Sequence, residues 1–372
     1  MKLNKEEEFF FSLIQAGLWG KAANLLNYEE IDFSAIYRLA EEQAVIGVIT
    51  SGLEHIDSTS IPKDVSLLFV GSALQLEQRN TAMNDFIENL IEKMRRAGIY
   101  ALLIKGQGLA QCYDKPLWRA CGDIDFLLSK DNYQKAIDFF TPLATSLDEE
   151  KPYDRHLSMK VDKWEVELHG TIRSGLWKKL DRTLDTIQKT LFFEGQVRSW
   201  MNGHTQVFLP KQDEDVLIVF GHILQHFFRG GVGLRQICDW CRLLWKYKDV
   251  ISNDLLETRI KSAGVMSEWK TFAALSVDFL GMPSEAIPFY DPSTHWSKKA
   301  SKAMRYILSV GNFGHNRDNS FYQDQSYFKR KFKAVLRRFE DFFIHFNVFP
   351  VDAFRVLVVL LARGCKTALK GK

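Results

Sequence analysis

The chain reads LLIKG at residues 102–106 and, after a short gap, RACGDIDFLL at residues 119–128. The first run is apolar and ends in Lys105-Gly106, a pattern typical of a buried strand that opens into a loop. The second run carries two acids that are separated by one residue. Because side chains alternate across a strand, Asp123 and Asp125 are predicted to share one face, and the apolar residues beside them the other.

Two carboxylates on one strand face repel each other. About 6.6 Å apart, at an effective dielectric constant of about 20, they repel by about 2.5 kcal/mol. An unpaired carboxylate in an apolar strand is also costly to bury. A divalent cation would offset both effects, so the sequence predicts a metal site at Asp123 and Asp125. The alternative interpretation is a chance acidic pair on a solvated loop.

Periodicity predicts the surrounding elements. Helices are expected over residues 5–95, 107–112, 129–140 and 213–248, the last broken at Arg229-Gly230-Gly231, and a central strand over residues 99–105. Two hairpins are expected, one pairing residues 156–160 with 164–169 and one pairing 196–201 with 205–209 around Asn202-Gly203. A polar loop is expected over residues 312–326.

The first hairpin supplies a third acid. In its second strand Glu165, Glu167 and His169 alternate with apolar residues and therefore share a polar face. We expect Glu167 to complete the carboxylate set, with Glu165 as the second choice for that role. His156 on the partner strand is interpreted as packed or exposed.

These patterns predict an α+β fold with a small mixed sheet flanked by helices and with N-terminal and C-terminal helical regions. We divide the chain into an N-terminal helical region at 1–96, a sheet-containing core at 97–210, a helical domain at 211–328 and a basic amphipathic helical tail at 329–372.

Composition limits the class of protein. The 372 residues carry a net charge of +3 and are 46% hydrophobic, as in an ordinary globular protein. Residues 329–372 hold eleven Lys or Arg against three acids, so the basic character lies in the tail, which argues against a broad nucleic-acid surface. We favour a helix with a solvated charged face there over weak contact with a membrane surface or a polyanion.

Two further features bear on location and metal binding. The N-terminus lacks a secretory pattern and no run of about 20 apolar residues occurs, so a cytoplasmic protein is expected. The pair Cys238 and Cys241 lies in an apolar helical run without a second pair, and we interpret both as buried helix residues and not as zinc ligands.

Taken together, Lys105-Gly106, Arg119, the acids 123 and 125, the run VELH at 166–169 and later histidine, Leu-Arg and Asp-Trp positions resemble a family. The family is that of largely uncharacterised bacterial nucleotidyltransferases, within the superfamily typified by DNA polymerase beta. The resemblance spans about residues 80–245. It departs from the superfamily pattern where Gly106-Gln107 replaces Gly-Ser and where Glu167 replaces an aspartate.

The resemblance implies a nucleotidyltransferase-type sheet at 97–210 and a magnesium-dependent enzyme, with Mn²⁺ as an alternative metal. It would move an NMP from an NTP to a hydroxyl or phosphate of an unknown small-molecule, sugar or protein acceptor. The implied catalytic and metal-binding residues are Asp123, Asp125 and Glu167. The implied nucleotide-binding residues are Lys105, Gly106, Gln107, Gly108, Arg119, Gly122 and His169. The alternative is a catalytically inactive nucleotide-binding regulatory or interaction protein.

The roles of several residues stay open at this point. His169 is expected either to bind a substrate group or to donate a hydrogen bond near Glu167. His222 and His226 are expected to line an acceptor pocket or to pack in the core, in preference to binding zinc. Arg235 and Asp239 are spaced for a helix ion pair that could support the site.

Overall fold

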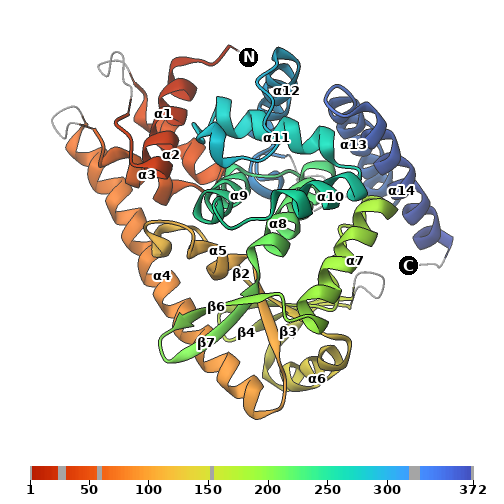
Figure 1. Cartoon of the computed structure of the whole chain (residues 1–372). Coiled ribbons are helices and arrows are strands. Elements are labelled where there is room, and N and C mark those ends of the chain that lie inside the picture. Colours follow the sequence, from red (N-terminus) through yellow and green to blue (C-terminus); the bar gives the residue numbers. More distant parts are fainter. Residues whose placement is uncertain (1, 24–30, 57–60, 151–154, 318–326, 370–372) are drawn as a thin grey trace.

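The computed structural model describes residues 2–23, 31–56, 61–150, 155–317 and 327–369. A five-stranded mixed sheet lies at one end of the molecule, and helices form most of the remainder (Figure 1). The predicted α+β class, with helical regions on both sides of the sheet-containing core, is therefore confirmed.

The strand order of the sheet is β1-β2-β5-β4-β3. The strands are β1 (Ala101–Ile104), β2 (Asp123–Leu128), β3 (Ala144–Leu147), β4 (His156–Val161) and β5 (Trp164–His169). Strands β2 and β5 run parallel, whereas the other neighbours in this sheet run antiparallel. The parallel register places Asp125 opposite Glu167, so these two predicted site residues lie side by side on adjacent strands.

Helices surround the sheet on several sides. Before it come α1 (Lys5–Trp19), α2 (Phe33–Glu42), α3 (Ile46–Leu53) and α4 (Lys63–Arg96), and between its strands lie α5 (Gly106–Ala110) and α6 (Lys130–Phe140). After it come α7 (Lys178–Phe193), the hairpin β6 (Val197–Asn202) and β7 (Thr205–Pro210), α8 (Gln212–Arg229), α9 (Leu234–Tyr247), α10 (Asn253–Ala263), α11 (Met266–Asp278), α12 (Thr294–Val310), α13 (Tyr327–Phe346) and α14 (Pro350–Leu369).

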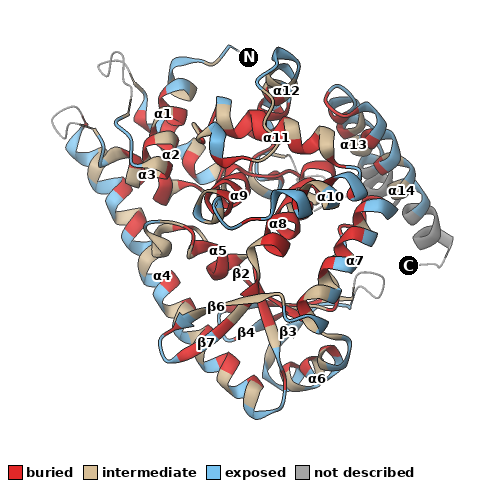
Figure 2. Cartoon of the chain, in the orientation of Figure 1, coloured by how far each residue is buried: buried red, intermediate tan, exposed pale blue. Residues whose placement is uncertain are grey.

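The two faces of β2 pack into two different cores. Ile124, Phe126 and Leu128 join an apolar cluster with residues of α4 and α6. Leu127, on the same face as the two aspartates, joins the larger cluster built by α1, α8, α9 and α11. Red buried segments therefore run from β2 into α8 and α9 in Figure 2. The aspartates stand where the sheet meets the helical region.

Helix α4 connects both cores. Its 34 residues correspond to a length of about 51 Å. Phe69 packs in the larger cluster, and Met83 packs in the cluster beneath the sheet. Cations in the last turn and Gly98 at φ 69° follow the predicted end signals of this helix.

Several local predictions are confirmed. Both hairpins form, the first turning at Asp162 and the second at Gly203. Strand β5 has the predicted bounds, and β4, β6 and β7 are extended or displaced by one residue. The Ser129 side chain accepts from the Asn132 amide and caps α6. The long helical stretch breaks between α8 and α9 at the expected glycines.

Other predictions were wrong. Residues 99–105 do not form a central strand, because β1 is the edge strand of the sheet and its outer side is covered by contact with β7. Strand β3 was not expected. Residues 318–326 of the predicted polar loop lie outside the described residues. The basic tail forms two helices, α13 and α14, and its contact with a membrane or polyanion stays a prediction.

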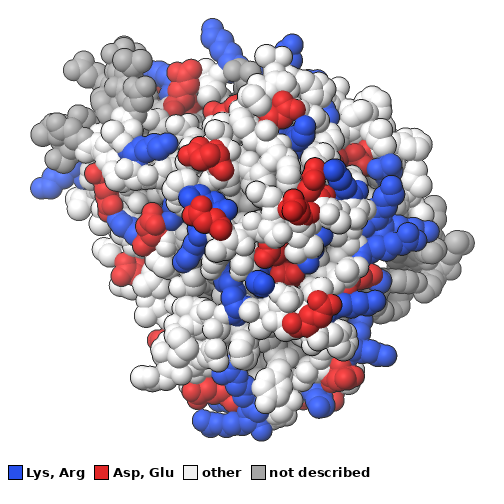
Figure 3. Space-filling model, viewed as in Figure 1, with Lys and Arg blue, Asp and Glu red and all other residues white. Residues whose placement is uncertain are grey.

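In the described part of the chain, no helix has the length and apolar character needed to cross a membrane. On the face shown in Figure 3, Lys and Arg side chains alternate with Asp and Glu side chains. This face therefore presents mixed charge and no broad basic surface.

Candidate active site

Three carboxylates converge at the centre of the molecule. Oxygen atoms of Asp123, Asp125 and Glu167 all lie within 4.8 Å of one another. Asp125 is 2% exposed, whereas Asp123 and Glu167 are half-buried. Strand alternation on β2 brings the aspartates together, and the parallel β2–β5 register adds Glu167. Such an oxygen-rich set suits a hard divalent cation.

Glu165 does not join this group. It is one alternation step before Glu167 on β5 and is exposed. Among the described residues, the three carboxylates on β2 and β5 that lie close enough to bind one metal ion are those of Asp123, Asp125 and Glu167. The geometry therefore favours Glu167 over Glu165 as the third carboxylate.

Lys105 turns back toward Asp125. Its backbone has φ 58° and ψ −144°, a conformation that costs a non-glycine residue about 1–3 kcal/mol. The ammonium Nζ lies 2.8 Å from Asp125 Oδ1. Burial alone would lower the pKa of Lys105, but Asp125, Glu167 and Asp123 outweigh it and raise this pKa. Lys105 is therefore a fixed positive charge inside the site.

Two histidines contact the carboxylates, and one of them bridges Asp125 and Glu167. His169 Nε2 lies 2.7 Å from Asp125 Oδ1 and 3.3 Å from Glu167 Oε2. His156 Nε2 lies 3.0 Å from the same Glu167 oxygen, and the two imidazole rings are 4.8 Å apart. Burial lowers the pKa of His169, but its hydrogen bonds to Asp125 and Glu167 prevail and raise it.

The carboxylates differ in proton affinity. The negative charge of Asp125, followed by burial, raises the pKa of Asp123. Burial also acts on Asp125 and Glu167, but Lys105 and His169 hold the pKa of Asp125 below its usual range, and hydrogen bonds from His156 and His169 do the same for Glu167. Asp123 is thus the carboxylate whose charge is least compensated.

The glycine loop after β1 meets the site at one residue. Gly106 has φ 42°, and a Cβ there would touch the Asp123 carbonyl and the Cys121 sulfur at 3.4 Å. The side chains of its neighbours face elsewhere: Gln107 Nε2 donates to Asn80 Oδ1 at 2.8 Å, and a Cβ on Gly108 would lie 2.8 Å from Leu209. Gly122 is exposed.

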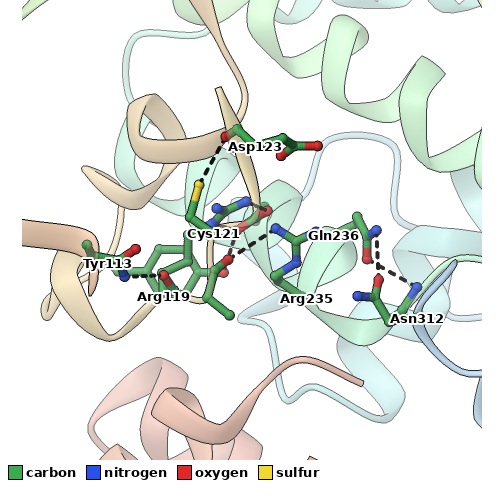
Figure 4. A network of polar contacts seen from close by, with 11 residues as sticks. Tyr113, Arg119, Cys121, Asp123, Arg235, Gln236 and Asn312 are labelled. Atoms are coloured by element: carbon green, nitrogen blue, oxygen red, sulfur yellow. Dashed lines mark hydrogen bonds and ion pairs between the residues drawn. The ribbon is translucent and has the colours of Figure 1, made fainter. Parts of the chain in front are cut away.

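Arg119 is held in a buried network with α9 (Figure 4). Its Nε donates to Asp239 Oδ1 at 2.9 Å and its Nη2 donates to Asp239 Oδ2 at 2.6 Å. The Tyr113 hydroxyl donates to the same carboxylate at 2.8 Å. Both side chains of the ion pair are 3% exposed. This pairing fixes the loop that leads into Asp123 and leaves Nη1 of Arg119 as a buried donor without a hydrogen bond.

The predicted ion pair between Arg235 and Asp239 is wrong. The carboxylate of Asp239 turns to Arg119 and Tyr113, whereas Arg235 Nη1 donates to the Ala120 carbonyl at 3.1 Å. The Arg235 guanidinium lies 5.9 Å from the ring centroid of Phe313. Figure 4 shows Arg235 beside the Arg119 network and Gln236 reaching Asn312. Arg235 and Asp239 nevertheless both line the cavity that contains the aspartates.

Two cavities meet at the carboxylates. We call the smaller one, of about 150 Å³, the carboxylate cavity. Its lining includes Lys105, Gly106, Arg119, Asp123, Asp125, Arg235 and Asp239. We call the larger one, of about 440 Å³, the histidine cavity. Its lining includes His156, His169, His222, His226, Arg173 and Arg229. Lys105, Glu167, His222 and His226 line both.

The α8 histidines are cavity residues, as expected. The rings of His222 and His226 lie 4.3 Å apart between the two cavities. Burial first, and then the charge of Lys105, lowers the pKa of His222 and brings the pKa of His226 to about 4. Both are neutral at pH 7. Cys238 and Cys241 are buried core residues, as predicted, and Cys241 Sγ donates to Ser276 Oγ at 3.2 Å.

Four residues at the site were missed or misread from the sequence. His156 was interpreted as packed or exposed, but it contacts Glu167. The hairpin register, in which His156 is opposite His169, carried the signal. Asp239 was assigned to a helix pair, and its partner is 120 residues away in the chain. Arg173 and Arg229, which line the histidine cavity, were not singled out.

Comparison with known proteins agrees with this geometry. A family model described as uncharacterised nucleotidyltransferase matches residues 29–281, which include both cavities except for Phe313. Neither the curated proteins nor the solved structures gave a match. The family match supports nucleotidyltransferase activity in general. The chain therefore belongs to the uncharacterised nucleotidyltransferase family.

Proposed function

We propose that the chain is a magnesium-dependent nucleotidyltransferase that moves an NMP from an NTP to a hydroxyl or phosphate of an acceptor. The observation that carries this proposal is the convergence of Asp123, Asp125 and Glu167 within 4.8 Å. Family membership supports the reaction class.

The donor set fits a divalent cation. Ionised carboxylates offer only acceptor oxygens, which Mg²⁺ prefers, with Mn²⁺ as an alternative. The pKa of Asp123 is raised mainly by the charge of Asp125, so a cation between them would relieve a repulsion that the protein leaves in place. Asp123, Asp125 and Glu167 would hold the metal. When bound, a pair of such ions would neutralise charge on the attacking oxygen and on the phosphates.

The protein's own groups would position the phosphates. Lys105 places a partly buried cation beside the carboxylates, and Gly106 lets the backbone approach closely at positive φ. Contacts of the nucleotide with Gln107 and Gly108 of α5 and with Gly122, directly before β2, stay predictions. Arg119 contacts Asp239, so we assign it to positioning this loop, with Nη1 as the group that remains for a phosphate oxygen.

Glu167 and His169 would act on the acceptor side. Glu167 lines both cavities and so lies where an acceptor oxygen can approach the α-phosphorus. As the alternative to holding the metal, this carboxylate would accept the proton of a hydroxyl acceptor as the new phosphorus–oxygen bond forms. His169 contacts Asp125 and Glu167 at once and would hold their relative orientation.

The direct test is incubation with α-³²P-labelled NTPs, Mg²⁺ and an acceptor panel, comparing the native chain with Asp123→Asn and Asp125→Asn. The proposal expects label transfer and pyrophosphate release that both variants lose. Equal transfer by all three proteins would exclude this site.

The second candidate is a nucleotide-binding regulator without turnover. It is favoured by one observation: Gln107 stands where the superfamily has serine, and its side chain turns to Asn80. Calorimetry distinguishes the two, because a regulator would bind an NTP with Mg²⁺ and release no pyrophosphate on any acceptor.

A further inference from the structure

The charges of the two cavities differ in sign. Among the described residues, the carboxylate cavity is lined by the acids Asp123, Asp125, Glu167 and Asp239 and by the cations Lys105, Arg119 and Arg235, so its acids are in excess. In the histidine cavity the lining acid is Glu167, and the lining cations are Lys105, Arg173 and Arg229. The carboxylate cavity is therefore suited to a cation. The histidine cavity, which adjoins the carboxylate cavity, is suited to an anion.

Arg229 is held in place at the far wall of the histidine cavity. It is the last residue of α8, and its Nη2 donates to the Gly175 carbonyl at 2.6 Å. The Arg229 carbonyl in turn accepts from Arg338 Nη1 of α13 at 2.7 Å. The bond to Gly175 holds the guanidinium and the bond from Arg338 holds the backbone. A guanidinium held in this way loses less side-chain entropy when it binds an oxyanion.

Arg173 stands on the loop that follows β5. Its Nε and Nη2 donate to the two oxygens of Asp185 at 2.7 and 2.6 Å, and its side chain is 50% exposed. It is therefore a partly neutralised cation on the exposed side of the cavity. Asp185 controls how much of its charge reaches a ligand.

The pKa values of the two α8 histidines indicate the sign of the electrostatic potential around them. After burial, the causes that lower the pKa values of His222 and His226 include the charges of Lys105 and Arg235. Neutral at pH 7, both rings offer hydrogen bonds without adding charge. The wall that they form with Gln225 is thus polar and lies in a positive environment.

From this arrangement we infer that the acceptor is a small anionic molecule. Its phosphate or carboxylate group binds at Arg229 and Arg173, and its reacting oxygen lies at Glu167. The inference rests on the proposed function, which it narrows. A cavity of about 440 Å³ has the size of a small-molecule site.

The transfer balances with these groups. The acceptor oxygen attacks the α-phosphorus of the NTP and forms a new phosphorus–oxygen bond. The bond from the α-phosphorus to the bridging oxygen breaks, and pyrophosphate leaves with that electron pair. A hydroxyl acceptor gives its proton to Glu167 and then to solvent, whereas a phosphate oxygen has none to give.

Calorimetry on the full chain tests the inference. The protein is first saturated with Mg²⁺ and the α,β-methylene analogue of ATP, GTP, CTP or UTP that binds, which fills the nucleotide side. It is then titrated with orthophosphate, with glycerol 3-phosphate, with glycerate and with glycerol. We expect the three anions to bind with Kd values of about 1 mM or tighter and glycerol not to bind.

Three variants locate the anion. Arg229→Gln should weaken orthophosphate binding about tenfold or more, because a charge-assisted contact is lost. Asp185→Asn should strengthen it several-fold, since Arg173 is released from its carboxylate, and damage to the fold would not produce such a gain. The matched control Arg38→Gln removes a cation of α2 whose side chain is 72% exposed and should change nothing.

The outcomes keep the two conclusions apart. If no nucleotide analogue binds, the proposed function fails, and orthophosphate is titrated with Mg²⁺ alone. Absence of anion binding up to about 10 mM, or binding that Arg229→Gln and Asp185→Asn leave unchanged, overturns the anionic acceptor whichever way the nucleotide result falls.

Discussion

Asp125 and Glu167 face each other across the parallel strands β2 and β5, and His169 Nε2 contacts an oxygen of each. The parallel register places two acids from distant parts of the chain at one level. A site of this kind holds its negative charge together only while Lys105 and His169, or a metal, compensate for it.

Asp125→Asn should abolish nucleotidyl transfer. Removal of a central oxygen ligand is expected to lower kcat at least about a thousandfold, which corresponds to about 4 kcal/mol of transition-state stabilisation. The measurement is the initial rate of pyrophosphate release. Mg²⁺ should raise the melting temperature of the native chain and not that of the variant.

The control for this change is Asp131→Asn, which removes an exposed aspartate from the first turn of α6. It should keep native rates. Circular dichroism checks that the fold persists in Asp125→Asn, since Lys105 and His169 lose their shared partner there. Native activity in a folded Asp125→Asn protein would contradict the proposed role.

Glu167→Gln and Glu165→Gln distinguish the third carboxylate. The two residues share a face of β5, but Glu167 lies within 4.8 Å of the aspartate oxygens and Glu165 is exposed. We expect Glu167→Gln to lower kcat/KM about a hundredfold or more and Glu165→Gln to lower it less than about twofold. The reverse order of effects would reassign the role to Glu165.

The sequence predicted the parts of the site that depend on local periodicity. Alternation alone placed Asp123 with Asp125 and Glu167 with His169, and the hairpin turns were right to within one residue. These features depend on the two-residue repeat of a strand and on turn residues that need positive φ. Both properties can be recognised from residues that are close together in the sequence.

Contacts between distant segments could not be predicted in the same way. Arg235 lies four residues before Asp239, at helical spacing. Nothing in the neighbouring sequence shows that Asp239 instead binds Arg119, which lies 120 residues earlier in the chain. Likewise β1 has the apolar sequence of a central strand because β7 covers its outer side, so burial was right and sheet order was wrong. Tertiary packing decides both cases.

The buried pair Arg119 and Asp239 should contribute strongly to stability. Asp239→Asn leaves a guanidinium that is 3% exposed without its counter-charge, so we expect the free energy of unfolding to fall by about 3 kcal/mol. The double variant Arg119→Met, Asp239→Leu should recover part of that loss, because neither charge is then buried. Urea denaturation measures all three proteins.

The pair Arg173 and Asp185 is the matched comparison for this prediction. It has the same two-bond geometry, but its side chains are 50% and 30% exposed. Asp185→Asn should therefore cost less than about 1 kcal/mol of unfolding free energy. Equal losses at both pairs would mean that burial is not what makes the Arg119 contact important.

His345 should make the protein less stable in mild acid. It is 3% exposed on α13 among Phe227, Phe228 and Tyr306, and burial lowers its pKa to about 4. The unfolded value is about 6.5. Between these values the unfolded chain binds more protons than the folded one, so the stability that is complete above pH 6.5 falls as the pH drops toward 4.

At pH 5 this histidine alone should cost about 2 kcal/mol relative to pH 7.5. His345→Phe keeps an aromatic ring and cannot be protonated, so its loss between the two pH values should be smaller than that of the native chain by this amount. Urea denaturation at both pH values gives the double difference. His55→Gln, at an exposed position, should retain the native pH dependence, and an equal acid loss in native and His345→Phe proteins would refute the assignment.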